Sequence, residues 1–507
     1  SHVMSSSSSC GLSEFAQNDA NASIGQDKLD ANEASALAGA GEQDSDDEFC
    51  KYFVTSCKDV EPPAKRHKTA DGEVEIGSAL SYPGFDGAPT KKQMTKMKIY
   101  VGWHKNEIAF RQVQVQWIDD ETEFGLVSTV DVEKNAEVFT DMPMVSMQTT
   151  YSKALAPACF NCHETIGTLR ANIDRCYLKK QKPPFSKKFD TFIDCVDEVL
   201  RPQKVGQLTC PCCSEIFCSA SCLKHHACIK RGKFWRRYVQ LATANIEAGE
   251  QLILLAHAIS NISRVDAAEL SEQTILERLR EYLVFYSKPW EELARDDSGR
   301  AKRVQMLNDA ALLLPLVFFG ETPVVQKFQV LFRKKTLSII LGAMSLTNVD
   351  ICYDCPYNAL LQRKLDKIPQ DGIDVLQSLQ EYTKDESEWF PQFYGTGLYR
   401  TASMCNHSCS PNIEISSHEN NRIIAASTRG IKKGEELTIS YIDQSQTLKQ
   451  RREELLKRYG FHCRCDKCRL EKLIAAPPVK FIGTERLTWQ KTGGNVDAFT
   501  EDLNCNV

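Results

Sequence analysis

The chain has 507 residues, a length that corresponds to roughly two to four domains. With 42% hydrophobic and 25% charged residues and a formal net charge of -5, it has the composition of a globular protein and not of a nucleic-acid coat protein. The most apolar run, residues 310–319, contains Pro315 and is far shorter than the roughly 20 residues of a membrane-spanning helix. We therefore expect neither a membrane segment nor a uniformly basic surface.

Residues 1–95 are rich in Ser, Ala, Asp, Glu and Gly and show almost no apolar periodicity. Such a composition predicts a disordered tail. Within it, the stretch from Pro62 to Lys68 places basic residues after two prolines. This cluster is either a nuclear import signal or a solvated charge run.

After Lys98 the sequence begins to alternate between apolar and polar residues. Val113, Val115 and Trp117 fall on one face of the chain, with glutamines between them. A period of two predicts a half-buried strand and the start of a β-sheet.

Cysteines gather in the next segment. The chain has 21 cysteines and no recognisable secretory signal, so reduced thiols that bind zinc or act in catalysis are expected instead of disulfides. Residues 159–228 hold ten of them and little else that predicts a core, so we expect this segment to fold around metal. Two closed tetrahedral zinc sites need eight ligands. The candidates are Cys159, Cys162, Cys210, Cys213, Cys218, Cys222, Cys228 and either His225 or His226.

Helical periodicity dominates between about residues 236 and 385, for example over Leu276 to Tyr286 and Val375 to Tyr382. Strand patterns return at 422–427 and 436–441, and the glycines between them predict a hairpin. A last helix over Leu448 to Tyr459 should end at Gly460. Its predicted stripe consists of Leu448, Arg452, Leu455 and Tyr459.

A second cluster follows this helix and supplies three thiolates, from Cys463, Cys465 and Cys468. A tetrahedral site needs a fourth ligand from elsewhere. Cys409 is our candidate and Cys405 is the competitor. The separate pair Cys352-x-x-Cys355 has no partners in the sequence and is interpreted as structural or free thiols.

Three motifs near the carboxyl end carry a resemblance to a known family. They are the stretch NHSC with PN over 406–412, GEELTISY over 434–441, and GF-x-C-x-C-x-x-C over 460–468. Together they look like the carboxyl half of a SET domain with its post-SET zinc loop, and 124–126 with 131–147 fits the other half. With a MYND-like finger between the halves, the chain is similar to the SMYD family of protein-lysine methyltransferases over about residues 110–470. The long gap in the finger and the lack of a large helical C-terminal domain resemble its divergent branch and related fungal SET proteins.

The resemblance implies an α+β fold: a β-rich SET domain split by a MYND-like zinc finger and a helical insertion, and closed by a post-SET zinc loop. The expected parts are a tail (1–95), the SET N-terminal half (96–158), the finger (159–228), the helical insertion (229–345), the SET C-terminal half (346–445), the post-SET loop (446–472) and a C-terminal tail (473–507).

The same resemblance implies how the ligands divide among three zinc ions, because the first and third ligand pairs of a MYND finger share one ion and the second and fourth pairs share the other. The expected sets are Cys159, Cys162, Cys218 and Cys222; Cys210, Cys213, His226 and Cys228; and Cys409, Cys463, Cys465 and Cys468.

The family further implies the roles of a cofactor site for S-adenosylmethionine. Tyr441 would be catalytic, with its hydroxyl orienting the lysine amine and the methyl group. The expected cofactor-binding residues are Gly125, Leu126, Asn348, Tyr399, Asn406, His407 and Phe461. One departure concerns the first cofactor loop, where Glu123 and Phe124 replace the usual Gly-x-Gly pattern and its polar or basic contact.

The sequence thus predicts an S-adenosylmethionine-dependent protein-lysine methyltransferase that acts on histones or other basic proteins, with ribosomal proteins as one option. It would reside in the nucleus and cytoplasm and recruit protein partners through the finger, without contacts to membranes or direct nucleic-acid binding. The alternative is a catalytically inactive interaction module that keeps the SET fold and binds partners through the MYND-like finger.

Overall fold

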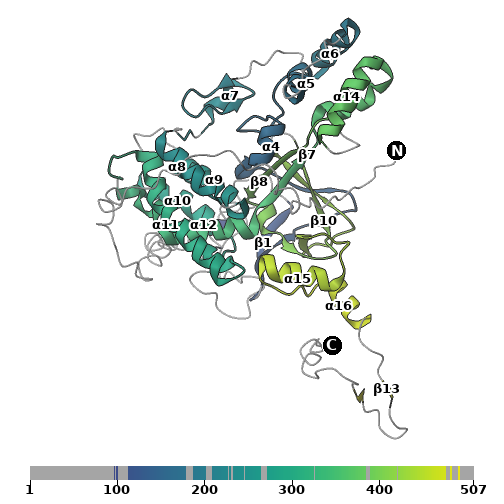
Figure 1. The fold of residues 1–507 in the computed structure, drawn as a ribbon. Coiled ribbons are helices and arrows are strands. Elements are labelled where there is room, and N and C mark those ends of the chain that lie inside the picture. Colours follow the sequence, from purple (N-terminus) through teal and green to yellow (C-terminus); the bar gives the residue numbers. More distant parts are fainter. Residues whose placement is uncertain are drawn as a thin grey trace, which may run out of the picture. The chain divides into compact units, whose positions relative to one another are not determined.

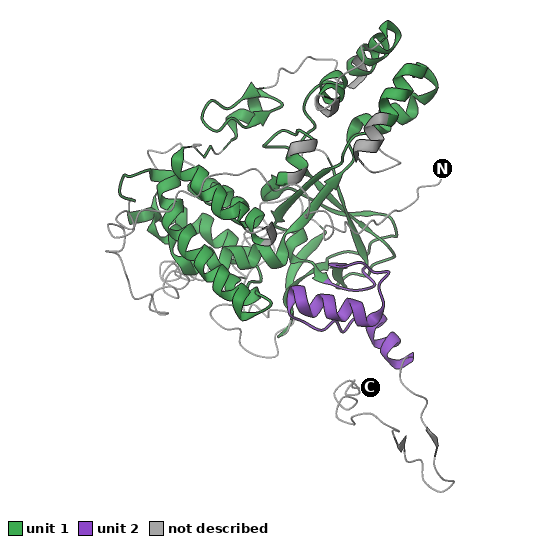
Figure 2. Ribbon diagram, viewed as in Figure 1, with its two compact units in different colours: residues 1–406, 412–439 green, residues 407–411, 440–507 purple. Residues whose placement is uncertain are grey.

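A computed structural model describes residues 112–474, apart from 121, 178–185, 201–207, 227, 230–231, 245, 264–270, 325, 384–388 and 419–420, together with 96, 99–100, 480–481 and 489–490. The predicted tail 1–95, with its basic cluster, and most of the tail 473–507 lie outside the described residues. The chain divides into two compact units (Figure 2), Ser1–Asn406 with Asn412–Ile439, and His407–Pro411 with Ser440–Val507.

The first unit is built on short antiparallel sheets. In the sheet that begins the fold, Val113, Val115 and Trp117 are buried, as the alternating pattern predicts, and Val115 pairs with Leu126 across the strands. The strands of this sheet are, in spatial order, β1 (Val113–Asp119), β2 (Glu123–Ser128), β12 (Glu436–Ile439) and β9 (Asn406–His407).

Two three-stranded sheets complete this β-rich region. One has the order β10 (Ile413–Ser417), β11 (Ile423–Ser427), β3 (Glu137–Asp141). The other has the order β4 (Pro143–Gln148), β8 (Phe393–Tyr399), β7 (Val349–Tyr353).

The prediction of a hairpin between the strands at 422–427 and 436–441 is wrong, because β11 and β12 belong to different sheets. The connection between them bridges back to the first half of the domain, where Ile431 pairs with Val132. It then turns at Gly434, whose φ of 84° is readily accessible only to glycine. The glycines that suggested a simple loop therefore lie in a connection between two different sheets.

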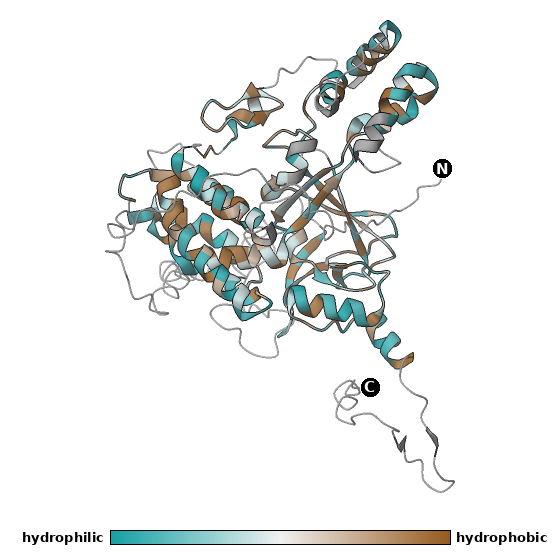
Figure 3. Cartoon of the chain, viewed as in Figure 1, coloured by the Kyte–Doolittle hydropathy of each residue, from teal (hydrophilic) through white to brown (hydrophobic). Residues whose placement is uncertain are grey.

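The predicted helical insertion is confirmed and packs into the same apolar core as the sheets. Trp290 is fully buried there, with its backbone N–H donating to Ser338 Oγ at 3.0 Å and its indole N–H donating to Gln251 Oε1 at 3.0 Å. Brown and teal residues both occur along these helices (Figure 3). The elements are α8 (Lys233–Thr243), α9 (Ile246–Ser263), α10 (Glu272–Leu283), η3 (Trp290–Leu293), α11 (Asp297–Phe319), η4 (Gln326–Phe332) and α12 (Lys334–Thr347).

A second helical cluster was not foreseen, and it corrects the expectation that 159–228 holds little besides metal ligands. Phe189, Ile193 and Val196 from this segment share an apolar core with Tyr357 and Leu361. Helices α5, α6 and α14 appear together in Figure 1. The cluster consists of α5 (Leu169–Tyr177), α6 (Lys187–Leu200), α13 (Pro356–Arg363), η5 (Leu365–Lys367) and α14 (Gln370–Thr383).

Insertion of α5 and α6 accounts for the long gap between Cys162 and Cys210. The Tyr357 hydroxyl donates to the carbonyl of Gly167 at 2.9 Å and ties the insertion to α13. The remaining short elements of the first unit are α4 (Thr150–Leu155), which precedes the finger, η6 (Ala402–Met404) and the finger's own pieces, described below.

The second unit contains the predicted last helix, α15 (Leu448–Tyr459), with the predicted bounds. Thr447 and Gln450 form a capping box at its start, and Gly460 ends it in the left-handed region with φ of 77°. The predicted stripe needs one correction. It included Arg452, but the buried residues of the helix are Arg451 and Leu455. Helix α16 (Asp466–Ile474) follows, and β13 (Lys480–Phe481) pairs with β14 (Trp489–Gln490).

Within the described part of the chain, no helix combines the length and the apolar character needed to cross a bilayer.

Candidate functional site

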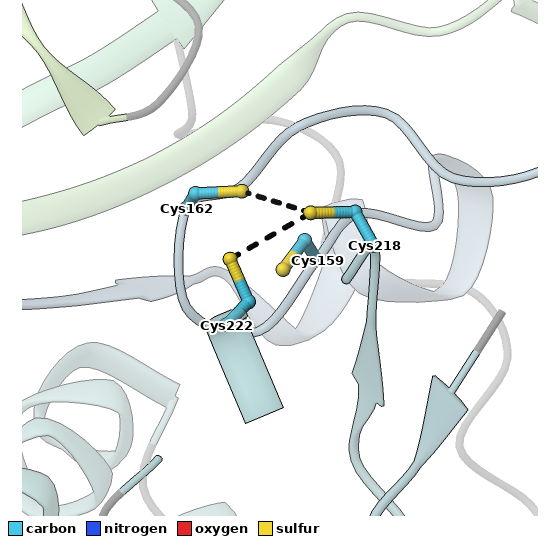
Figure 4. Close-up of side chains that lie close together, drawn as sticks. All are labelled: Cys159, Cys162, Cys218 and Cys222. Atoms are coloured by element: carbon cyan, nitrogen blue, oxygen red, sulfur yellow. Dashed lines mark hydrogen bonds between the residues drawn. The ribbon is translucent and has the colours of Figure 1, made fainter. Parts of the chain in front are cut away.

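Eleven cysteines and one histidine gather in three clusters. In each cluster, four ligand atoms lie within 4.8 Å of one another. The clusters are Cys159, Cys162, Cys218 and Cys222 (Figure 4); Cys210, Cys213, His226 and Cys228; and Cys409, Cys463, Cys465 and Cys468. The structure thus brings together all twelve predicted ligands in the three predicted sets.

The spacing of these atoms fits tetrahedral zinc. Zinc–sulfur bonds of about 2.3 Å place two sulfurs of a tetrahedral site about 3.8 Å apart. Sulfur–sulfur distances are 3.5 Å for Cys162–Cys218, 3.7 Å for Cys210–Cys228 and 3.8 Å for Cys409–Cys463. Thiolates and imidazole are the donors that structural zinc prefers, so all three clusters fit zinc ions.

The two Cys-x-x-Cys pairs of the finger are presented by the same kind of turn. His163 and Ser214 both have a φ of 58°, and their N–H groups donate to the carbonyls of Cys159 and Cys210, each at 2.8 Å. The turn curls the backbone so that both sulfurs of a pair lie in the same cluster. β5 (Leu208–Thr209) precedes the second pair, and β6 (Ile216–Phe217) and α7 (Ala220–Lys224) follow it.

The structure decides between the two alternatives for the histidine ligand. His226 Nε2 lies 3.1 Å from Cys213 Sγ, inside the second cluster. The exposed His225 instead places Nδ1 at 2.8 Å from the Ser221 carbonyl within α7. His226 therefore has the position of a ligand and His225 does not.

The fourth ligand position of the last cluster is occupied by Cys409. Its sulfur lies 3.5 Å from that of Cys468. Cys405 is buried outside the cluster, in the apolar core of the first unit, where burial raises the pKa of its thiol above the ordinary value. Cys352 and Cys355 belong to none of the three clusters found among the described residues.

In the first unit, three predicted or newly visible residues converge where β2 approaches β12. The Asn406 amide donates to Glu436 Oε1 at 2.8 Å. Gly125 lies against both: a Cβ at this position would come within 2.7 Å of Glu436 Oε1 and 2.8 Å of Asn406 Nδ2. An added side chain at this position would therefore displace Glu436 and Asn406 from their observed places, and Leu126 beside it is fully buried.

Glu436 was missed by sequence reasoning, which used it only as part of a motif. Burial raises the pKa of its carboxyl above the ordinary value, although the hydrogen bond from Asn406 opposes this shift. Its role here is to fix the orientation of the Asn406 amide. The adjacent Asn412 accepts a bond from the Thr438 N–H at 2.8 Å and donates to the Glu436 carbonyl at 2.8 Å, so the segment after the motif is held on β12.

The departure at Glu123 has a structural counterpart that the sequence did not reveal. Glu123 has a φ of 58°, and its carboxylate pairs with the buried Lys96 ammonium at 2.9 Å. Lys96 also lies 5.9 Å from the centre of the Phe124 ring. The negative charge introduced into this loop is thus offset by a lysine from upstream of the first strand.

Asn348 and Tyr399 have different surroundings. Asn348 caps the end of α12, and its buried Oδ1 accepts no hydrogen bond from the described residues, so it fits a donor group of a bound molecule. Tyr399 is fully buried and its hydroxyl donates to the Asn421 carbonyl at 2.9 Å. Its predicted contact with a cofactor stays a prediction.

In the second unit, His407, Tyr441 and Phe461 form an aromatic group together with Tyr459. The ring of His407 lies 5.2 Å from that of Tyr441 and 6.0 Å from that of Phe461. Tyr459 lies 4.9 Å from Tyr441 and was not predicted as a site residue. Its place in the motif-free stretch before Gly460 gave no signal beyond helical periodicity.

His407 holds the backbone at Tyr441. The Tyr441 N–H donates to His407 Nδ1 at 3.0 Å, which requires this nitrogen to be unprotonated. Burial lowers the pKa of His407 to about 4, so the ring stays neutral at physiological pH. Since Cys409 follows two residues later, the same short loop carries a zinc ligand and the support of Tyr441.

Comparison with known proteins agrees with these observations. A family model for the SET domain matches residues 123–442, which is more than half of the chain. The chain is 24% identical over 376 residues, 68% of its length and 83% of the relative, to a protein-lysine N-trimethyltransferase SMYD5 of Gallus gallus.

Two further relatives match over shorter stretches. A histone-lysine N-methyltransferase ATXR2 of Arabidopsis thaliana is 28% identical over 217 residues, 40% of this chain and 44% of that protein. A histone-lysine N-methyltransferase SET5 of Meyerozyma guilliermondii is 42% identical over 77 residues, 15% of this chain and 16% of that protein. The chain thus spans less than half the length of both.

The resemblance inferred from three short motifs is therefore confirmed, including its SMYD-related and fungal character. The finger and the post-SET loop account for the three clusters of zinc-type ligands. The chain belongs to the SET domain family.

Proposed function

We propose that this chain is an S-adenosylmethionine-dependent protein-lysine N-methyltransferase. The observation that carries the proposal is the close packing of Gly125, Asn406 and Glu436 inside a chain that matches the SET domain model. Gly125 leaves room for the Asn406 and Glu436 side chains, Glu436 orients the amide of Asn406, and the buried Oδ1 of Asn348 offers an acceptor. These groups fit a polar cofactor with donor and acceptor groups.

The bound cofactor supplies an electrophilic methyl group, and no covalent enzyme intermediate is needed. The protein's contribution is alignment, desolvation and fixed dipoles. The attacking lysine must be neutral although its ordinary pKa is near 10.4, and an aromatic surrounding disfavours the charged form. Tyr441, Tyr459 and Phe461 are suited to such a surrounding, with the Tyr441 hydroxyl orienting the amine.

The proposed substrates are histones or other basic proteins, with ribosomal proteins as an option. Two of the relatives carry histone-lysine in their names and one carries protein-lysine, which supports a lysine on a protein but leaves both substrate classes open. We further propose residence in the nucleus and cytoplasm, on the basis of the cluster from Pro62 to Lys68, and recruitment of protein partners through the finger.

The alternative is an interaction module without catalysis, and the altered loop at Glu123 first suggested it. The ion pair with Lys96 weakens that argument, because the loop no longer presents an uncompensated carboxylate. Titration of the full chain with S-adenosylmethionine in a calorimeter separates the two functions. Binding supports the enzyme, and no binding by a zinc-loaded, folded chain favours the module.

The substrate class requires a second assay. Purified chain, labelled S-adenosylmethionine and either core histones or ribosomal proteins should give labelled protein in one of the two mixtures. Acid-stable label on lysine, located by mass spectrometry, would identify the class. Cofactor binding without transfer to either mixture would remove both substrate proposals and leave the cofactor site standing.

A further inference from the structure

A buried arginine lies beside the third zinc cluster. Arg451, in the first turn of α15, is 1% exposed and is among the largest fully buried side chains of the protein. Its Nη2 lies 3.8 Å from Cys468 Sγ and 2.7 Å from Glu471 Oε2. Its Nη1 donates to the Gln446 carbonyl at 2.6 Å. All of these residues belong to the second unit.

Burying a guanidinium is costly unless a charge or polar group nearby compensates it. Glu471 supplies one carboxylate, but its side chain is 35% exposed, so water screens part of that interaction. An arginine guanidinium cannot be deprotonated in a protein, because its ordinary pKa lies above the pH range in which proteins are folded. The guanidinium is therefore fully charged.

The zinc cluster carries a negative charge that needs compensation. Four thiolates around a divalent zinc ion leave a net charge of roughly -2 in a site of which Cys409, Cys463 and Cys468 are buried. A cation that also donates a hydrogen bond to a ligand sulfur lowers the cost of this charge and withdraws electron density from the thiolate. Among the described residues, Arg451 is the buried cation in contact with a ligand of this cluster.

We propose that Arg451 is a positioning residue of the third zinc site. Its guanidinium helps the site to retain the metal and suppresses the nucleophilicity of the four thiolates. Glu471 orients the guanidinium from its solvent side. The inference depends on zinc in this cluster and is independent of methyl transfer.

The finger clusters provide an internal reference for the test. The full chain, loaded with zinc, is treated with N-ethylmaleimide, and the alkylation rate of each ligand cysteine is followed by mass spectrometry of its peptide. Zinc release is recorded in parallel with a colorimetric chelator. The variants are Arg451→Gln, Arg451→Lys, Glu471→Gln and the control Arg458→Gln, which removes an exposed arginine of the same helix that pairs with Glu454.

Loss of an outer-shell partner typically weakens metal binding by roughly 10- to 100-fold. Arg451→Gln should raise the alkylation rates of Cys409, Cys463, Cys465 and Cys468 by about 10-fold or more. The seven finger cysteines should react as in the wild type. Arg451→Lys keeps the charge without the planar fork and should be intermediate, Glu471→Gln should have a smaller effect, and Arg458→Gln should have none.

Two results would overturn the proposal. The first is an unchanged rate at the four post-SET cysteines in Arg451→Gln. The second is an equal increase at all eleven ligand cysteines, which a merely structural role of Arg451 in overall stability would produce. If Arg451→Gln does not fold, Arg451→Lys and Glu471→Gln carry the same comparison, and wild-type rates in both would contradict the proposal.

Discussion

Gly125 and Asn406 lie on a sheet that shares a large apolar core with the helical insertion, whereas Tyr441 lies in the second unit, where the core is small. That small core contains five buried residues, and three of them are the zinc ligands Cys409, Cys463 and Cys468. The proposed cofactor residues are thus supported by hydrophobic burial, whereas the proposed catalytic tyrosine lies in a unit whose core consists mostly of candidate zinc ligands. The finger is built like the second unit, because most of its buried residues are also cysteines.

Metal removal should separate the two kinds of region most strongly. Apparent binding free energies of roughly 10 to 16 kcal/mol per structural zinc are folding energy for such segments. After chelation, limited proteolysis should cut the finger and residues 440–474 readily while fragments of the sheets and of α8 to α12 survive. Unchanged protease resistance in a chain shown by metal analysis to contain no zinc would contradict this comparison.

A methyl group at Gly125 tests the sheet side. The Cβ of Gly125→Ala would lie 2.7 Å from Ile118 Cγ1 and equally close to Glu436 Oε1, and overpacking of this kind costs about 1 to 3 kcal/mol. We expect affinity for S-adenosylmethionine to fall by about 10-fold or more in calorimetry, a similar energy. Zinc content should stay at the wild-type value.

Gly430→Ala is the matched control, since the nearest atom to its added Cβ is the Val132 carbonyl oxygen at 4.0 Å. It should bind cofactor as the wild type does. Equal affinity in both alanine variants would show that Gly125 is not part of the cofactor site.

The smallest expected effect concerns Glu436→Gln. A hydrogen bond to a charged group contributes about 1 kcal/mol more than a bond between neutral groups. The substitution should therefore hold the Asn406 amide less firmly and reduce cofactor affinity about fivefold. Stability should respond in the opposite direction. Because burial raises the pKa of Glu436 in the folded state, ionisation destabilises the wild type as pH rises above the ordinary value of 4.5.

Thermal denaturation checks this sign. The melting temperature of Glu436→Gln relative to the wild type should increase between acidic and neutral pH. A difference that stays constant or decreases over that range would mean that the carboxyl is stabilised as the anion.

The sequence predicted the parts of the protein whose chemistry is local. Cysteine spacing, the capped helix from Leu448 to Tyr459 and the alternation at Val113 each report on neighbouring residues, and the structure agrees with them. The family resemblance then supplied the order of the SET halves and the pairing of ligands in the finger.

What the sequence did not predict depends on residues far apart in the chain. The core shared by α5, α6, α13 and α14 joins two separate insertions, and neither segment alone indicates it. The ion pair of Lys96 with Glu123, and the place of β11 and β12 in different sheets, likewise require the folded chain. The sequence pattern placed Arg452 on the buried stripe of α15, whereas the folded chain buries its neighbour Arg451.

The central claim is that Tyr441 serves methyl transfer, and one measurement tests it most directly. Single-turnover transfer of labelled methyl from S-adenosylmethionine to a protein that the wild type modifies should be compared for the wild type and Tyr441→Phe, each with its zinc content and cofactor affinity measured. Loss of alignment should slow transfer by roughly 100-fold while zinc and cofactor binding are retained. Transfer at the wild-type rate by Tyr441→Phe would contradict the proposed role of this residue.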